Sequence, residues 1–90
     1  MKRVHLWVSG RVQGVGFRAS TRRRARNNDV TGWVKNLEDG RVEAVLEGDE
    51  EDVAEVMDWM REGPSMARVE DVEFQEEKPE ILERFRIKRD

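Results

Sequence analysis

The segment VTGWVKNLEDGRVEAVLEG, residues 30–48, contains the pattern that decides the fold. Its two halves, residues 30–37 and 41–48, are rich in apolar and β-branched residues, which favour strands. Asp39-Gly40 lies between them and is typical of a tight hairpin turn, because glycine accepts the positive φ that such turns require. The sequence therefore predicts two adjacent antiparallel strands in the middle of the chain.

A helix is predicted on each side of this hairpin. Residues 17–28 contain no proline and stop at Asn28-Asp29, residue types that tolerate left-handed geometry. The second helix follows Asp49, an N-cap candidate with Asp52 three residues later, as in a capping box. Gly63-Pro64 is its stop signal. Its core-facing stripe follows helical spacing and comprises Val53, Val56, Met57 and Met60.

Further strands are predicted outside the two helices. Apolar side chains alternate along residues 4–8, which indicates a half-buried strand. A fourth strand lies within residues 66–76, where the alternation breaks once and indicates a β-bulge. A short last strand contains Phe85 and Ile87. The order β-α-β-β-α-β plus a short final strand predicts an α+β fold, a ferredoxin-like α/β sandwich with an antiparallel sheet and two helices on one face.

Length and composition exclude several classes of protein. Ninety residues allow one domain, which we place at residues 1–90. The absence of Cys excludes a disulfide scaffold, a thiolate nucleophile and Cys-ligated zinc, and a single His cannot build a His-rich metal site. No apolar run approaches the roughly 18 residues of a membrane span, and the N-terminal run is too short for a signal peptide. We expect a cytoplasmic protein without metal or cofactor.

The net charge of −3 conceals a strong asymmetry along the chain. Residues 1–28 contain eight basic and no acidic residues, whereas residues 29–90 contain nine basic and twenty acidic residues. The first segment therefore carries +8 and the second −11. A positive N-terminal third predicts an anionic partner. We interpret the cluster Arg22–Arg26 as a solvated helix face whose charges pair with the acidic residues of the remaining chain. Those acidic residues are expected to be mostly solvated surface. The arginine cluster is also expected to steer a small anion toward the protein.

The segment GRVQGVGFR, residues 10–18, carries the clearest functional signal. Gly14 and Gly16 allow the backbone to turn so that several N–H groups face one point. The start of the following helix adds partial positive charge. Arg18 lies in the first turn of that helix, where its guanidinium can bind a phosphate through two hydrogen bonds. Together these features predict a phosphate-binding site.

GRVQGVGFR, followed by GWVKN at residues 32–36, resembles the acylphosphatase family, small enzymes that hydrolyse carboxyl-phosphate mixed anhydrides. The likeness extends over nearly the whole chain, through GWVKNLEDG, VEAVLEGDEEDV, Gly63-Pro64 and the terminal FRI. It implies a metal-independent hydrolase with an acyl phosphate as substrate and inorganic phosphate as product. One departure is Asn28-Asp29, which stands where similar chains have Leu-Gly, so the packing of the first helix is expected to be weaker.

The resemblance also implies roles for individual residues. Arg18 corresponds to the family's catalytic arginine, Asn36 to the asparagine that holds the attacking water, and Thr21 to a supporting threonine. The phosphate-binding loop corresponds to Arg11, Val12, Gln13, Gly14, Val15 and Gly16.

Two alternative functions stay open from the sequence. The same fold and loop can form a non-catalytic module that binds phosphate or carbamoyl phosphate. The arginine run also suggests an RNA-binding ferredoxin-like domain, but such domains display stacking aromatic residues on their strands, and only 7% of this chain is aromatic. We therefore expect a monomer that acts on a small acyl phosphate, with neither nucleic acid nor membrane as partner.

Overall fold

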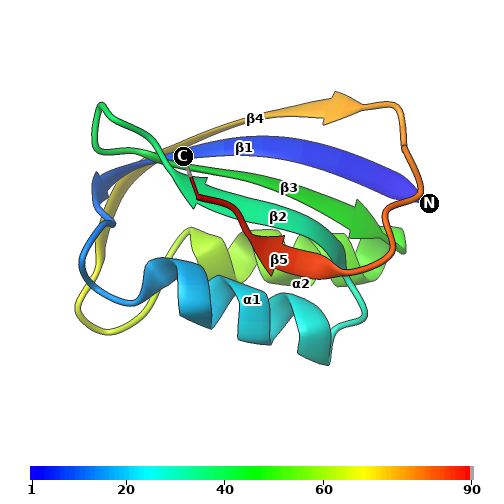
Figure 1. The fold of residues 1–90 in the computed structure, drawn as a ribbon, viewed down its shortest axis with the longest axis horizontal. Coiled ribbons are helices and arrows are strands. Elements are labelled where there is room, and N and C mark those ends of the chain that lie inside the picture. Colours follow the sequence, from blue (N-terminus) through cyan, green and yellow to red (C-terminus); the bar gives the residue numbers. More distant parts are fainter. Residues whose placement is uncertain (90) are drawn as a thin grey trace.

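The computed structural model describes residues 1–89, which form a five-stranded sheet and two helices (Figure 1). The spatial order of the strands is β4-β1-β3-β2-β5, and both helices cover one face of the sheet (Figure 1). This arrangement confirms the predicted ferredoxin-like α+β fold. The elements are β1 (Lys2–Arg11), α1 (Phe17–Asn27), β2 (Thr31–Asn36), β3 (Val42–Gly48), α2 (Glu50–Met60), β4 (Arg68–Glu77) and β5 (Phe85–Ile87).

The predicted hairpin is present as the antiparallel pair β2–β3, in which Thr31 pairs with Glu47 and Asn36 with Val42. Gly32 is essential to this pairing. Its φ of 136° suits glycine, and a Cβ atom there would overlap the carbonyl oxygen of Val45. The backbones of β2 and β3 therefore approach each other more closely at this point than any other residue type allows.

The sheet is mixed, so the prediction of an antiparallel sheet was wrong for its last strand. β5 pairs in parallel with β2, with Gly32 opposite Phe85 and Val34 opposite Ile87. The reason is the connection at residues 78–84, which crosses from one edge of the sheet to the other at the end where β4 finishes. The chain then runs back opposite to β4, which is the direction of β2.

The predicted irregularity of β4 is confirmed as a bulge. Ser9 pairs with Asp71 but Gly10 pairs with Val69, so Glu70 has no partner in β1. The other expected local feature, a capping box on α2, was wrong. Asp49 occupies the N-cap position, but its side chain makes no capping hydrogen bond. Three acidic residues in the first turn of α2 lie instead where the helix dipole favours negative charge.

The helices bury narrow apolar faces against the sheet. Val53, Val56 and Met60 of the predicted α2 stripe are fully buried, and Met57 is partly buried. α1 buries Phe17, Thr21 and Ala25. The helix ends as expected, because Asp29 adopts a φ of 56°.

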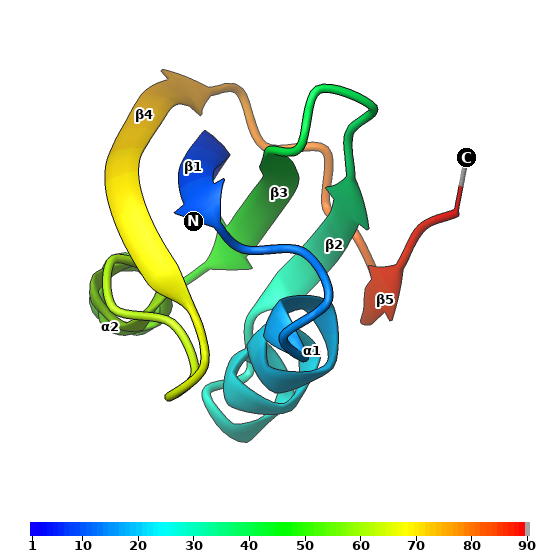
Figure 2. The ribbon, with the colours of Figure 1, turned by 90° about the vertical axis from the view of Figure 1, so that its left-hand side faces the viewer.

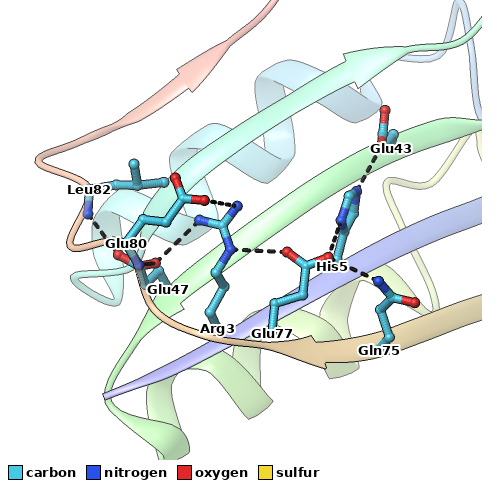
Figure 3. Close-up of polar contacts among 8 residues, drawn as sticks. All are labelled: Arg3, His5, Glu43, Glu47, Gln75, Glu77, Glu80 and Leu82. Atoms are coloured by element: carbon cyan, nitrogen blue, oxygen red, sulfur yellow. Dashed lines mark hydrogen bonds and ion pairs between the residues drawn. The ribbon is translucent and has the colours of Figure 1, made fainter.

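A buried carboxylate at the end of β3 holds the crossing connection in place (Figure 3). Glu47 is 1% exposed and accepts hydrogen bonds from the backbone N–H groups of Glu80, at 2.8 Å, and Leu82, at 2.7 Å. The Arg3 guanidinium lies 3.3 Å from the same carboxylate. A buried charge is tolerated only when it is paired and hydrogen-bonded, and Glu47 satisfies both conditions. Its position therefore fixes the route of residues 78–84.

A second cluster occupies the helix-free face of the sheet (Figure 3). His5 lies 2.7 Å from Glu77 through Nδ1 and 2.7 Å from Glu43 through Nε2. Its ring stacks on Trp7 at 4.2 Å and meets Trp33 edge-on at 5.7 Å. Each ring nitrogen of His5 therefore faces a carboxylate oxygen of a different strand. Glu43, Glu47 and Glu77 are thus engaged inside the fold and are exceptions, because most acidic residues within 1–89 are exposed, as expected.

The expectation that the arginine cluster pairs with acidic residues was also wrong. Within residues 1–89 every ion pair involves Lys2, Arg3, His5, Lys35 or Arg41 on the basic side, and none involves an arginine of α1. The acidic residues that form ion pairs lie mainly on the strands, around the face of the sheet that carries no helix. α1 packs against the other face. The arginines of α1 therefore have no ion-pair partner among the described residues.

We expect Gly32→Ala to destabilise the protein by roughly 3 kcal/mol, because it adds backbone strain to a clash with the Val45 carbonyl. Gly48→Ala is the matched control on the neighbouring strand, since a Cβ atom there meets its neighbours at 3.4 Å or more. That control should change the free energy of unfolding by less than about 1 kcal/mol. Urea denaturation of both variants checks the difference, and equal stabilities would contradict the close approach.

We expect the stability of the fold to decline between pH 4.5 and about pH 2. Hydrogen bonds from Gln75, His5 and Arg3 hold the pKa of Glu77 at about 2, below its ordinary 4.5. Burial alone would raise the pKa of Glu47, but the N–H groups of Glu80 and Leu82 and the Arg3 guanidinium lower it. The unfolded chain thus binds more protons in this window, so stability is full above pH 4.5 and is lost as the pH falls.

Urea denaturation at several pH values measures this slope. Glu77→Gln should flatten it, whereas Glu73→Gln, an exposed carboxylate on the same strand, should leave it unchanged. An identical slope in the parent protein and Glu77→Gln would contradict the assignment.

Candidate active site

The loop between β1 and α1 reverses through two left-handed glycines. Gly14 has a φ of 75° and Gly16 a φ of 78°, and Gly16 is the N-cap residue of α1. A Cβ atom at either position would meet nothing within 4 Å, so glycine is required there for its backbone conformation and not for space. The first turn of the helix begins with the hydrogen bond from the Ser20 N–H to the Gly16 carbonyl, at 3.0 Å.

One side chain ties this loop to the β2–β3 hairpin. Gln13 Nε2 donates hydrogen bonds to the carbonyl oxygens of Leu37, at 2.8 Å, and Arg41, at 2.9 Å. Val12 is fully buried in the core and Val15 is packed against it. The sequence predicted Gln13 as part of a phosphate-binding loop. In the structure its side chain holds that loop beside the end of β2 through these two hydrogen bonds.

A cleft of about 190 Å³ opens where the loop, the start of α1 and the end of β2 meet. Arg18 reaches it from the first turn of α1, and Asn36 from the last residue of β2. These two residues are 18 positions apart in the sequence, and the fold places them in one cavity. The complete lining comprises Val12, Gly14, Gly16, Phe17, Arg18, Ala19, Asn36, Ile87 and Arg89.

Asn36 carries the most informative atom of the cleft. Its Oδ1 is buried and accepts no hydrogen bond from any residue within 1–89. Buried polar side-chain atoms in proteins nearly always have a partner, so an unpaired acceptor in a cleft indicates a position for a donor from outside the chain. A water molecule or a ligand N–H or O–H group has the chemistry of such a donor.

Other predicted site residues lie outside the cleft lining. Arg11 is exposed at the end of β1, opposite Arg68 of β4. Thr21 is fully buried, and its hydroxyl donates to the carbonyl oxygen of Phe17 at 2.8 Å. The side chains of Gln13 and Val15 also lie elsewhere, as described above. The roles assigned to these residues remain predictions.

The structure adds four lining residues that sequence reasoning missed, of which Phe17 and Ala19 are the chain neighbours of Arg18 and the other two come from the end of the chain. Ile87 of β5 and Arg89, just beyond it, both line the cleft. They reach it because β5 pairs in parallel with β2 and therefore ends near Asn36. The terminal FRI motif indicated a strand, but it contained no signal for the partner of that strand.

The described residues contain neither an evident metal site nor a membrane-spanning helix. Within residues 1–89 no three His, Asp or Glu side chains are grouped so that they could hold a metal ion. In the same range, neither helix combines the length and the apolar character needed to cross a membrane.

Fold and site together define a class of protein: a small ferredoxin-like α+β domain with a cleft between a glycine-rich strand-to-helix loop and the neighbouring strand end. The model of the family "Acylphosphatase" matches residues 4–87. The chain belongs to the acylphosphatase family.

Individual relatives agree with this membership. The acylphosphatase of Thermococcus kodakarensis is 56% identical over 89 residues, which cover 97% of this chain and 98% of the relative. The crystal structure of acylphosphatase from Bacillus subtilis superposes with a TM-score of 0.96 at 37% identity, covering 99% of this chain and all of the other. HypF of T. kodakarensis contains a similar region, with a TM-score of 0.86 and 38% identity, but this chain covers only 12% of it.

We expect Gln13→Met to lower the free energy of unfolding by about 1–3 kcal/mol, because two hydrogen bonds are lost at similar side-chain length. The affinity for inorganic phosphate should fall with it, since the loop loses its attachment to the hairpin. Asn27→Met is the control, because Asn27 is an exposed amide at the end of α1, outside the loop and the hairpin. Thermal denaturation and phosphate titration measure both effects, and a Gln13→Met protein with parental values would contradict the positioning role.

Proposed function

We propose that this protein hydrolyses the carboxyl-phosphate bond of acyl phosphates to a carboxylate and inorganic phosphate, through metal-independent in-line attack of water. The observation that carries the mechanism is the buried, unpaired Oδ1 of Asn36, a residue that lines the same cleft as Arg18. Membership of the acylphosphatase family supports the substrate class.

The chemistry requires charge neutralisation more than acid catalysis. An acyl phosphate already has a carboxylate as its leaving group, so no strong general acid is needed at the leaving oxygen. The phosphoryl group carries negative charge that repels a nucleophile, and fixed positive groups reduce this barrier. Arg18 supplies a guanidinium, and the start of α1 supplies partial positive charge. We assign phosphate binding to these groups and to the loop that includes Gly14 and Gly16.

Alignment of the water is the role that we assign to Asn36. Its Oδ1 accepts a hydrogen bond from the water and thereby directs the water oxygen toward phosphorus. The new P–O bond forms as the bond to the acyl oxygen breaks, and the electron pair leaves with the carboxylate. No Asp, Glu or His is part of the cleft lining within residues 1–89, so the phosphoryl oxygens of the substrate take the proton of the water.

The remaining assignments belong to the same proposal. Residues 11–16 form the phosphate-binding loop, in which Gln13 and Val15 act through positioning and Arg11 through its charge outside the cleft. Thr21 supports the first turn of α1 through its bond to the Phe17 carbonyl. We further propose that residues 1–90 are one domain that acts as a cytoplasmic monomer on a small molecule. The near-complete coverage of the T. kodakarensis and B. subtilis acylphosphatases supports the single domain.

Substitution of the two central residues tests the division of roles. Arg18→Ala should lose affinity for inorganic phosphate together with turnover of a simple acyl phosphate such as acetyl phosphate. Asn36→Ala should retain phosphate affinity but lose about 10²–10³-fold in kcat, the usual cost of a lost positioning or charge-stabilising group. Asn27→Ala, an exposed asparagine on α1, is the control and should keep the parental kcat.

Steady-state kinetics in the presence of a chelator, combined with phosphate titration, gives these values. An Asn36→Ala protein with parental kcat would overturn the water-holding role. A parent protein that binds phosphate but turns over no acyl phosphate would instead indicate a non-catalytic binding module.

A further inference from the structure

A second and larger cavity lies on the helical side of the molecule. It measures about 600 Å³ and is formed by α1 together with the end of α2 and the segment that follows it. Figure 2 shows the two helices side by side beneath the sheet. None of its lining residues lines the catalytic cleft, so the two cavities are separate. We call this cavity the helix groove, and its polar and aromatic lining includes Ser20, Arg23, Arg24, Asn27, Trp59 and Ser65.

The helix groove is positively charged, and the fold does not neutralise it. Arg23 and Arg24 line it, whereas no Asp or Glu of the described chain does. Neither arginine forms an ion pair within residues 1–89, as established above for all arginines of α1. Arg26 beside them donates to the carbonyl oxygen of Phe85 at 3.1 Å, which leaves its charge uncompensated as well. Such an arrangement attracts anions.

Side chains of the helix groove are also partly preorganised for ligand binding. The Arg24 guanidinium lies 5.3 Å from the ring centre of Trp59, a cation–π contact that restrains the arginine. Trp59 is in turn backed by Phe17, with ring centres 5.8 Å apart. Ser20, Asn27 and Ser65, which carry neutral donors, line the same groove as the two arginines. Guanidinium groups with amide and hydroxyl donors are the chemistry that recognises phosphate oxygens.

We propose that the helix groove binds the phosphate chain of a polyphosphorylated anion, as found in inorganic polyphosphate and in nucleoside triphosphates, independently of the catalytic cleft. The size of the groove favours a chain over a single phosphate, because its volume of about 600 Å³ compares with about 190 Å³ for the cleft. Two adjacent arginines and a row of neutral donors along α1 also match several phosphates better than one.

Calorimetric titration with sodium tripolyphosphate tests the proposal. The double variant Arg23→Gln/Arg24→Gln should bind it at least about tenfold more weakly than the parent, because each lost charge-assisted hydrogen bond is worth about a factor of ten or more. It should still hydrolyse acetyl phosphate at the parental rate. Arg84→Gln/Arg86→Gln is the matched control, since it removes two exposed arginines from another surface and should retain the affinity. Arg18→Ala should retain it as well.

Three further arms separate the possible ligands. ATP that binds more tightly than tripolyphosphate, with a change in fluorescence that Trp59→Phe abolishes, would support a nucleotide as the ligand. Equal affinities would support the phosphate chain itself. The proposal is overturned if Arg23→Gln/Arg24→Gln binds tripolyphosphate like the parent, if the control double variant loses as much affinity, or if Arg18→Ala abolishes binding. Binding of a single-stranded RNA oligomer without any binding of tripolyphosphate would overturn it too.

Discussion

Two hydrogen bonds from one side chain hold the functional end of this molecule together. Gln13 bonds to the carbonyl oxygens of Leu37 and Arg41, which lie on either side of the β2–β3 turn. The loop that precedes α1 is thereby held against the end of β2, and Arg18 and Asn36 come to share one cleft. The left-handed conformations of Gly14 and Gly16 then set where the helix begins. The proposed chemistry depends on this junction, because neither element alone contains both an arginine and an unpaired acceptor.

A second set of polar contacts lies at the opposite end of the sheet. The Glu47 carboxylate, buried at the end of β3, receives the N–H groups of Glu80 and Leu82 and the guanidinium of Arg3. This fixes the connection by which the chain passes from β4 to the far edge, where β5 pairs with β2. Ile87 and Arg89 reach the cleft as a result. A cluster far from the cleft therefore determines which side chains close one of its walls.

The features that could be predicted from the sequence depend on residues that are close together along the chain. The Asp39-Gly40 turn and the glycines before Arg18 are local signals, and they correctly predicted the hairpin and a tight turn before α1. Anion binding by that loop stays a prediction. The missed features depend on distant partners. The partners of Gln13 lie 24 and 28 residues further along the chain, and those of Glu47 lie 33 to 44 residues away. A glutamine in a loop and a glutamate on a strand look like surface residues until such partners are known. The direction of β5 was missed for the same reason.

The charge asymmetry of the chain also has a structural explanation. Part of the acidic excess is engaged on the sheet, around Arg3 and His5, whereas the arginines of α1 form no ion pair within residues 1–89, and three of them line the two cavities. The central claim is that the smaller cavity directs water to phosphorus. Hydrolysis of acetyl phosphate in ¹⁸O-labelled water, with a chelator present, tests this claim most directly. The label should enter inorganic phosphate and not acetate. Label in the acetate would contradict the proposed mechanism, because water would then have attacked the carbonyl carbon.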